Sequence, residues 1–396
     1  SSHWLQRLLY EARKMLHFLL GSSSPDGEPF YFLSDELPMP TNPPPCKTFK
    51  TFEEQAKLLI TRHLEASKDD LICRLKAVNY YRLTGYLHIF RETKTDHQGN
   101  RTKADDYRHG TTLDLVWKYY LFDRRLRLLL LDAIERIEIA LRTHVAYYWA
   151  KSTKCSNPQK FSTSYRPDFN KITRDGNSEQ TRSRKDNLLK TFQRSFDRSI
   201  DDCVLHHKED LGFRNVEDLP IWVFVELSTI GELAWLFSGL KNNLQMEIAS
   251  NFGCPDIIFF TSLITLIHHA RNACAHHARV WNRTWNQSRG ATNNPAARIQ
   301  LNPIVKNTSL TDWNLQWDKN QNQWLPRAKA AREFSFQKTS TAFLLTACRY
   351  FLRASAHTSA WNARVMELFT RADTPSNVIV EMGFPKHWEK HPFWTN

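Results

Sequence analysis

Apolar residues recur every three or four positions along most of the chain, which is the spacing of amphipathic α-helices. The longest such pattern begins after Thr112 and continues to about Ala150. Its apolar positions predict one buried face, made of Leu115, Tyr119, Phe122, Leu126, Leu129, Leu130, Ala133, Ile137 and Ala140. Strict alternation of apolar and polar residues, which is typical of strands, is scarce. We therefore expect a mainly α fold with few or no strands.

Shorter helices are predicted on both sides of this long one. Thr51 and Glu54 form a capping box, which opens a helix to about residue 64. Pro220 stands in the first turn of another helix. The remaining helical patterns cover residues 69–79, 185–207, 220–240, 255–281, 331–355 and 359–371. Three polar segments are typical of loops, namely residues 91–107, 151–183 and 284–325.

The N-terminal segment, residues 1–45, differs from the rest of the chain. It holds an amphipathic helix pattern at residues 3–20, followed by a linker rich in Ser and Pro. We expect this helix to pack on the body of the protein or on a second copy. Contact with a membrane is the alternative for a basic amphipathic helix. Residues 46–396 form the predicted helical domain, with central helices at about 110–283 and C-terminal helices at about 331–396.

The composition excludes several classes of protein. Hydrophobic residues make up 41% of the chain, with 24 Phe and 13 Trp, which is too apolar for a disordered protein. Only 12 Gly are present, and neither the phosphate-loop nor the dinucleotide-binding glycine motif occurs. The net charge of +13 and the isoelectric point of about 9.4 favour a polyanionic partner such as RNA.

Basic residues concentrate between residues 151 and 198. The candidates for RNA contact in this region are Arg182, Arg184, Lys185, Lys190, Arg194 and Arg198. Acidic residues such as Asp168, Asp175 and Asp186 dilute this charge, so an ordinary solvated face is the alternative interpretation. A second basic region lies at residues 327–353.

The cysteines and the hydropathy of the chain indicate the cellular compartment in which the protein works. Seven Cys are scattered without a C-x-x-C pair, which is typical of free thiols in a reducing environment. No signal-peptide pattern is visible. The longest strongly apolar run, from Ile257 to Ile267, is too short to span a bilayer and fits a buried helix. We expect a cytoplasmic protein that does not enter a membrane.

The predicted helix at residues 255–281 carries the candidate catalytic residues. Its apolar stripe continues into Arg271, which lies within about 20° of Ile264 at 100° per residue. A second, polar stripe follows intervals of three and four residues and consists of His269, Asn272, His276, Arg279 and Arg283. Asn272 and His276 are one turn apart, and the long stem of Arg271 can swing toward them.

Arg271, Asn272 and His276 suit cleavage of RNA without a metal or another cofactor. The 2′-hydroxyl must lose a proton as it attacks phosphorus, and the leaving 5′-oxygen must gain one. Histidine titrates near neutral pH and can serve both transfers. Arginine offers a charged, planar set of donors to the phosphate oxygens, and asparagine can orient the His ring or bind the phosphate.

The spacing of Arg271 and His276 is by itself weakly specific. Arg271 as a buried charge paired with Glu226 or Glu138, and His276 as a core histidine, are the structural alternatives. A zinc site is the third alternative. One helix cannot direct all five of the crowded candidate ligands toward one ion; they are His268, His269, Cys274, His276 and His277.

Several blocks of sequence, in the right order, resemble one bacterial family. The segment RNACAHHARVWNR at residues 271–283 resembles the signature of the Abi-like family, the abortive-infection proteins of AbiD/AbiF type. TFEEQAKLLITRHL and NYYRLTGY are similar to the family's opening, and YRHGTTLDLVWKYYLFDRRLRLLLLDAIERIEIALRTHVAYY is similar to its central helix. LPIWVFVELSTIGELAWLF and the closing MGFPKHW and HPFW complete a resemblance that covers about residues 45–396.

The resemblance implies a HEPN-like helical bundle with long helices and additional N- and C-terminal helices, related to the nuclease domains of type VI CRISPR effectors. Their R-x4-6-H motif falls here on Arg271, Asn272 and His276, and His277 also fits the permitted spacing. The accessory candidates are His269, His277, Arg279 and Arg283. HEPN sites are usually composite, so a single motif implies a homodimer with two motifs at the two-fold axis; a single half-site that suffices is the alternative.

The function implied by the resemblance is phage defence. The protein would be an abortive-infection toxin, an endoribonuclease that leaves 2′,3′-cyclic phosphate ends, restrained by a small structured noncoding RNA that acts like an antitoxin. Two other functions stay open. One is a non-catalytic RNA-binding module, and the other is a dimeric interaction protein of a defence system.

Overall fold

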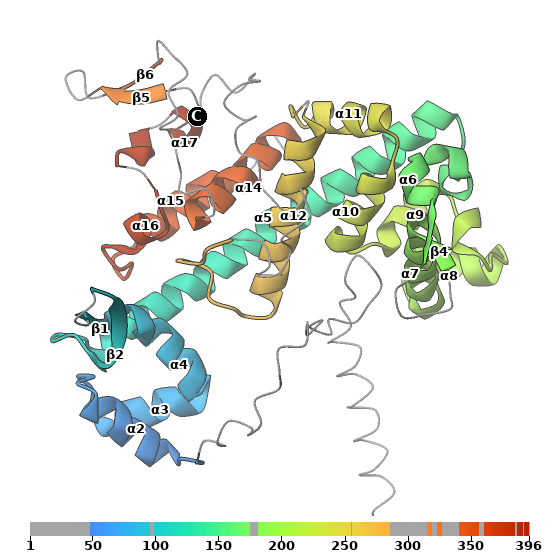
Figure 1. Cartoon of the computed structure of the whole chain (residues 1–396). Helices are drawn as coiled ribbons and strands as arrows, with labels where there is room; N and C mark the ends of the chain where they lie inside the picture. Colours follow the sequence, from blue (N-terminus) through green and yellow to red (C-terminus); the bar gives the residue numbers. More distant parts are fainter. Residues whose placement is uncertain are drawn as a thin grey trace, which may run out of the picture. The chain divides into compact units, whose positions relative to one another are not determined.

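The computed structural model describes residues 48–95, 99–174, 181–254, 256–285, 315–318, 323–326, 340–355, 360–384, 386–390 and 392–395. The described chain is mainly α-helical, as the periodicity predicts (Figure 1). It divides into two compact units. One holds residues 141–249; the other, here called the motif unit, combines the described residues up to 140 with those from 250 onward. The predicted helix at residues 3–20 and its linker lie outside the described residues.

The motif unit begins with three short helices, α2 (Phe52–Thr61), α3 (Lys68–Val78) and α4 (Tyr80–Leu87). The capping box at the start of α2 is confirmed, since Thr51 N donates to Glu54 Oε2 at 2.7 Å and Glu54 N donates to Thr51 Oγ1 at 3.2 Å. Asn79 ends α3 and caps α4 with its side chain.

Residues 91–107 form a hairpin, so the prediction of a loop there was wrong. Strands β1 (Arg91–Thr95) and β2 (Arg101–Tyr107) pair antiparallel, with Thr93 opposite Lys103. Both strands are largely exposed, and only Ala104 and Tyr107 are buried, so the charged outer face hid the strand pattern. Two smaller hairpins lie in the other predicted loops: β3 (Ile172–Arg174) with β4 (Thr181–Ser183), and β5 (Leu315–Asp318) with β6 (Gln323–Pro326).

The long helix α5 (Leu113–Thr153) matches its prediction closely. Thr112 Oγ1 accepts a hydrogen bond from Leu115 N at 3.1 Å, which fixes the helix start. Most of the predicted apolar face is buried, namely Tyr119, Phe122, Leu126, Leu130, Ala133 and Ile137. Two charged residues, Asp123 and Arg127, are buried along the same helix.

In the 141–249 unit, the described helices after α5 are short: α6 (Pro167–Asn170), α7 (Arg184–Arg198), α8 (Asp202–Leu205), α9 (Ile221–Phe224), α10 (Ile230–Gly239) and α11 (Asn242–Asn251). The helix predicted at 185–207 ends at Arg198. The helix predicted at 220–240 is broken at Ser228, because Thr229 caps a new helix through a capping box with Glu232. Stacked Phe192 and Phe224 rings, 4.3 Å apart, join α7 to α9.

The motif unit is completed by α12 (Ile257–Ala275), α14 (Thr341–Ser355), α15 (Trp361–Thr370), α16 (Val378–Glu381) and α17 (Pro392–Thr395). Helix α14 forms the second part of the helix predicted at 331–355; residues 331–339 lie outside the described residues, and Ser340 precedes the helix. It packs on α12 through Phe351 and Phe260, whose ring centroids are 5.6 Å apart. Among the described helices, none combines the length and the apolar character that crossing a membrane requires.

Candidate functional site

Helix α12 ends at Ala275, before the predicted end at residue 281. Ala278 N donates to Ala273 O at 2.8 Å and His277 N donates to Cys274 O at 3.0 Å, which is the hydrogen-bond pattern of a Schellman motif. His277 has a φ of 57° and occupies the left-handed position that glycine usually takes. The chain therefore turns away from the helix axis immediately after His276.

This turn corrects the predicted polar stripe. His269 and Asn272 lie on the helix, and His276 follows one turn later, its N–H bonded to Asn272 O at 2.9 Å. Arg279 and Arg283 lie beyond the helix and do not extend the stripe. Arg279 donates to Gly85 O, and the Arg283 guanidinium lies 5.2 Å from the ring centroid of Trp285.

Arg271 and Asn272 are joined to each other and to His268. Arg271 Nη1 donates to Asn272 Oδ1 at 3.3 Å, and Asn272 Nδ2 lies 3.3 Å from His268 Nε2. Burial and the neighbouring charges of His269 and Arg271 lower the pKa of His268 to about 4, so the ring is neutral and its Nε2 can accept the amide proton. Glu226, considered as a partner for Arg271, pairs instead with Arg142 at 3.3 Å.

His268 is the residue of this site that sequence reasoning missed. It entered only as a candidate zinc ligand, although its four-residue spacing from Asn272 places the two on one helix face. The zinc alternative gains no support, because the described residues contain no group of three His, Cys, Asp or Glu side chains that can hold a metal ion. Burial raises the pKa of the Cys274 thiol to about 12, so it is protonated at neutral pH.

The side chains of the site differ in access to solvent. His269, His276 and His277 are exposed, while Arg271 and Asn272 are half-buried. An exposed imidazole can exchange protons with a bound substrate, and the half-buried Arg271 is bonded to Asn272, one turn before His276. His276 does not have the burial expected of a core histidine.

Asp123 holds the segment after the turn against α5. Its Oδ1 accepts hydrogen bonds from Val280 N at 3.0 Å and Trp281 N at 2.7 Å. Its Oδ2 accepts one from Tyr86 Oη at 2.6 Å and forms an ion pair with Arg127. Burial raises the pKa of Asp123, and the charge of Arg127 opposes this. One buried carboxylate therefore joins α4, α5 and the residues that follow the motif.

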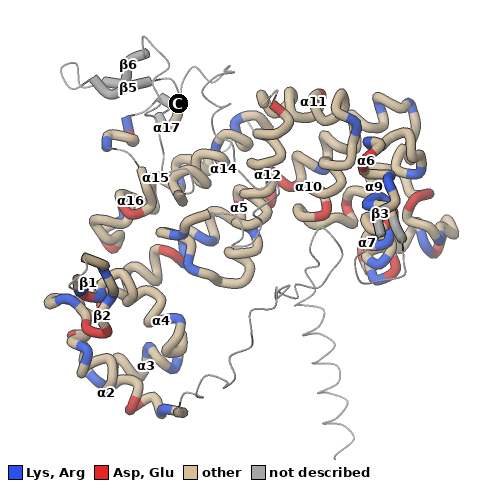
Figure 2. Tube along the Cα trace, viewed as in Figure 1, with Lys and Arg blue, Asp and Glu red and all other residues tan. Residues whose placement is uncertain are grey.

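Side chains of two arginines and a threonine also stabilise the turn, by donating hydrogen bonds to its backbone carbonyls. Arg82 donates to His277 O, and Arg127 Nη1 donates to Ala278 O at 3.2 Å. These donors supply positive charge at the carboxyl end of α12, where the helix dipole is negative. Figure 2 shows basic positions gathered around this end of α12 and the adjoining part of α5. On the other side, Thr341 Oγ1 donates to Val280 O at 2.6 Å.

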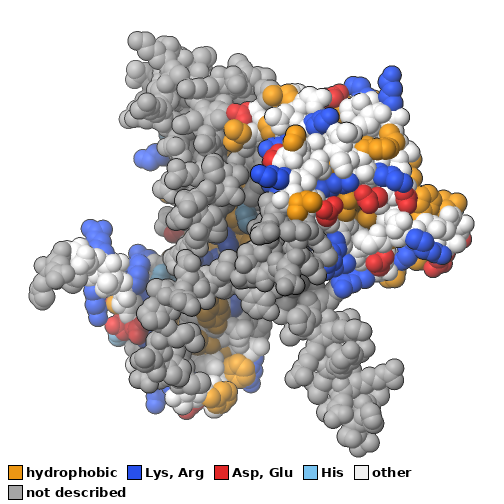
Figure 3. All heavy atoms as spheres, turned by 45° about the vertical axis from the view of Figure 1, so that its right-hand side comes forward, with side chains coloured by type: hydrophobic (Ala, Val, Ile, Leu, Met, Phe, Trp, Pro, Cys, Tyr) orange, Lys and Arg blue, Asp and Glu red, His pale blue; other side chains and the backbone are white. Residues whose placement is uncertain are grey.

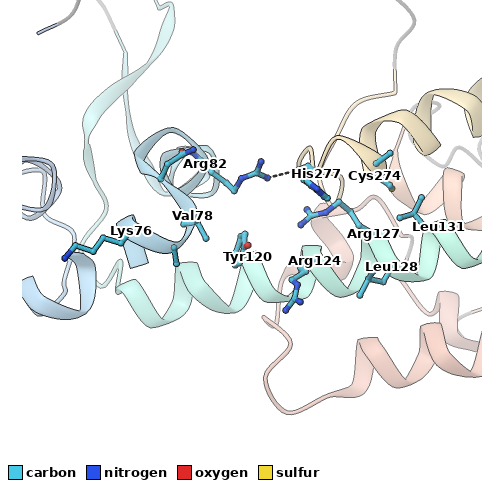
Figure 4. Close-up of a pocket in the computed structure, with 13 residues that line it drawn as sticks. Lys76, Val78, Arg82, Tyr120, Arg124, Arg127, Leu128, Leu131, Cys274 and His277 are labelled. Atoms are coloured by element: carbon cyan, nitrogen blue, oxygen red, sulfur yellow. Dashed lines mark hydrogen bonds between the residues drawn. The ribbon is translucent and has the colours of Figure 1, made fainter. Parts of the chain in front are cut away.

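A cavity of about 710 Å³ opens beside the turn (Figure 4). It is lined by residues of α3, α4, α5 and the end of α12, including Lys76, Arg82, Tyr120, Arg124, Arg127 and His277. Figure 4 shows Arg82 and Arg127 reaching toward the turn at His277, while Lys76 and Arg124 extend outward from the walls. His277 therefore faces the cavity, whereas His276 is not among its lining residues.

The predicted RNA-contact residues lie in the 141–249 unit. Lys190, Arg194 and Arg198 are exposed and spaced four residues apart on α7. Arg184 is also exposed, with its guanidinium 5.1 Å from the ring centroid of Phe169. Figure 3 shows acidic side chains interspersed with basic ones on the face of this unit.

Lys185 and Arg182 differ from the exposed basic residues of this unit. Lys185 is buried, and its Nζ donates to Lys160 O at 3.2 Å, so it supports the fold and is removed from the RNA-contact set. The side chain of Arg182 lies outside the described part. Residues 327–339 of the second basic region, with four of its six basic residues, are also outside it; the described Arg349 is buried and donates to Phe393 O.

Comparison with known proteins places the chain in a family. The sequence model of the family described as Abi-like protein matches residues 74–282, which is more than half of the chain. This range contains the cavity, Asp123, and the segment from His268 to Trp281. No curated protein and no solved structure matches the chain. The protein therefore belongs to the Abi-like protein family.

Proposed function

We propose that this protein acts in abortive infection as a metal-independent endoribonuclease of HEPN type, in which Arg271, Asn272 and His276 carry the reaction. Family membership supports the abortive-infection role. The observation that carries the chemistry is the arrangement at the end of α12. His276 is exposed one turn after Asn272, and Asn272 is hydrogen-bonded to Arg271.

The proposed reaction is an internal transfer at phosphorus. The 2′-oxygen forms a bond to phosphorus while the bond to the 5′-oxygen breaks, which yields a 2′,3′-cyclic phosphate and a 5′-hydroxyl. A proton leaves the 2′-hydroxyl and another is delivered to the 5′-oxygen. His276 serves as the proton-transfer group, and the Arg271 guanidinium balances charge on the phosphate oxygens.

The proposal includes a homodimer in which two copies of the motif face each other, so that one His276 removes a proton and the other supplies one. Leu128 and Ile139 on α5 are 60% and 48% exposed. They are eleven residues apart and so share one side of the helix. Together with the exposed Glu135 between them, they form a mixed apolar and charged side that offers a surface for a second copy. An I139E variant, which leaves the cavity lining unchanged, is expected to be monomeric by light scattering and to lose cleavage.

The proposal also includes RNA as regulator. A small structured RNA would occupy the basic surfaces and restrain the nuclease, and the exposed stripe of Lys190, Arg194 and Arg198 is suited to its phosphates. Sequencing of RNA that copurifies with the protein identifies such a partner.

The test is incubation of the purified protein with total RNA in EDTA. Wild type is expected to produce fragments with 2′,3′-cyclic phosphate and 5′-hydroxyl ends. H276A is expected to be slower by about 10²–10⁴, the effect of losing one proton-transfer group. H109A, which removes another exposed histidine of the motif unit, is the matched control and should cut at the wild-type rate. Equal rates for wild type and H276A would refute the assignment.

A second candidate function is RNA binding without cleavage. The cationic cavity favours it, because basic side chains gather there while His276 is not among the lining residues. This function predicts tight, salt-dependent binding and no new RNA ends in any preparation freed of bound RNA.

A further inference from the structure

The cavity beside the turn combines the two surfaces that a nucleotide needs. Its volume of about 710 Å³ lies within the range of small-molecule sites. Part of the wall is apolar or aromatic, formed by Val78, Tyr120, Leu128 and Leu131. Four of the 13 lining residues are basic, namely Lys76, Arg82, Arg124 and Arg127, and none is acidic. An apolar wall accommodates a base, and a cationic wall accommodates a phosphate.

The basic residues of the cavity are not equivalent. The charge of Arg127 is neutralised by its buried ion pair with Asp123. Arg82 uses one donor on His277 O, which leaves the rest of its guanidinium fork for another acceptor. Arg124 is exposed, and in the described part of the chain it has no acidic partner. Arg82, inside the cavity, and Arg124, which extends outward at its rim, therefore keep donors for an anion; Lys76 also extends outward, from the α3 wall.

Tyr120 is held in place by other aromatic rings. Its centroid lies 4.7 Å from that of Trp117 and 5.5 Å from that of Tyr86, the latter in an edge-to-face arrangement. The Tyr86 hydroxyl is in turn bonded to Asp123. A ring fixed in this way loses little freedom when a base stacks on it. The same network that closes the turn thus positions the aromatic wall.

We propose that the cavity binds a nucleotide unit, with its phosphate on Arg82 and Arg124 and its base against Tyr120. This inference rests on the proposed nuclease function in one respect: the bound nucleotide is taken to belong to the RNA strand, next to the cleaved bond. Ala275 and His277, the neighbours of His276 on either side, both line the cavity. A strand anchored there is held beside His276.

The test measures binding of a fluorescent 2′-O-methyl oligoribonucleotide to the full chain. This probe has no free 2′-hydroxyl and cannot be cleaved, so binding is read independently of catalysis. R124Q is expected to weaken binding about tenfold, the loss of one charged hydrogen bond. It is also expected to lower the slope of log K against log salt by about 0.7, the value for one phosphate of a single strand. Y120L is expected to weaken binding about fivefold or more through lost stacking.

R125Q is the matched control, because it removes the same charge from the next residue of α5. Arg125 does not line the cavity and pairs with Asp373 at 2.7 Å. Its variant should bind the probe like wild type. Equal weakening by R124Q and R125Q would overturn the inference, since it would reflect net charge alone. A specific effect of R124Q in a protein that never cuts RNA would uphold the site and reject the nuclease.

Competition by AMP identifies the source of the nucleotide. AMP presents the same phosphate and base, so it is expected to displace the probe from wild type and to do so less well from R124Q. Displacement only at AMP concentrations far above the affinity for the probe supports the RNA strand as the occupant. Displacement at comparable concentrations supports a free nucleotide in the same site. No displacement of the probe by AMP at any concentration would overturn the inference.

Discussion

Replacement of Asp123 by alanine is the strongest test of how the motif turn is held. Asp123 is fully buried and Arg127 is 5% exposed, so the variant leaves a buried arginine without its counter-ion. Removal of one partner from such a pair costs about 3–5 kcal/mol. The Val280 and Trp281 amides also lose their acceptor. We expect D123A to lower the free energy of unfolding by about 3–5 kcal/mol, measured by urea denaturation followed by circular dichroism.

The same helix provides a matched control. Asp114 and Lys118 have the same four-residue spacing at 2.8 Å, but their side chains are 75% and 44% exposed. D114A is therefore expected to cost less than about 1 kcal/mol. D123N retains an oxygen for the two amides but loses the charge and the second acceptor, which faces Tyr86 and Arg127, so its cost should be intermediate.

Hydrogen exchange separates a local effect from a global one. In D123N the amides of Val280 and Trp281 are expected to exchange faster than in wild type, while those in the middle of α14 change little. The reasoning is refuted if D123A and D114A unfold at the same urea concentration, because the buried carboxylate would then contribute no more than a surface one.

Three further predictions follow from other contacts. H277G removes a side chain from a left-handed position at φ 57° and is expected to stabilise the protein by about 1 kcal/mol in thermal unfolding; loss of cleavage in this variant would transfer the catalytic role to His277. The pKa of His268 is about 4 in the folded chain against 6.5 ordinarily, so the unfolded chain binds a proton that the folded one excludes. Stability should fall by up to about 3 kcal/mol as the pH drops from 6.5 to 4, and H268Q should flatten this slope in urea titrations. T341V should cost about 1–3 kcal/mol by leaving the buried Val280 carbonyl without its donor, whereas T346V, which loses only a bond to a helix carbonyl, should cost less in the same assay.

The sequence predicts a helix of this protein well where the helix buries a single, regularly spaced apolar face. In α5 the apolar interval is regular for many turns, and most of the predicted face is buried. The capping box at Thr51 and Glu54 is equally local, since its partners are three residues apart. Features of this kind depend on neighbours in sequence, and their patterns can be read from it.

The features that the sequence did not predict depend on residues far away in the chain. Helix α12 continues in the periodic pattern to residue 281, yet the chain turns at His277 without the glycine that usually marks such an end. The bonds that stabilise this turn come from Arg82 and Asp123, far away in sequence. Asp123 itself interrupts an apolar face, and only the fold shows that four groups converge on it.

The position of Thr341 has a consequence for how the protein is made. Thr341 bonds the Val280 carbonyl from 61 residues further along the chain. At about 5–20 residues per second, the ribosome takes roughly 3–12 s to cover that distance. During this interval the nascent chain already contains Arg271, Asn272 and His276 but lacks the contact that closes their turn from the C-terminal side. For the proposed ribonuclease, this order of synthesis delays the finished site until most of the chain has left the ribosome.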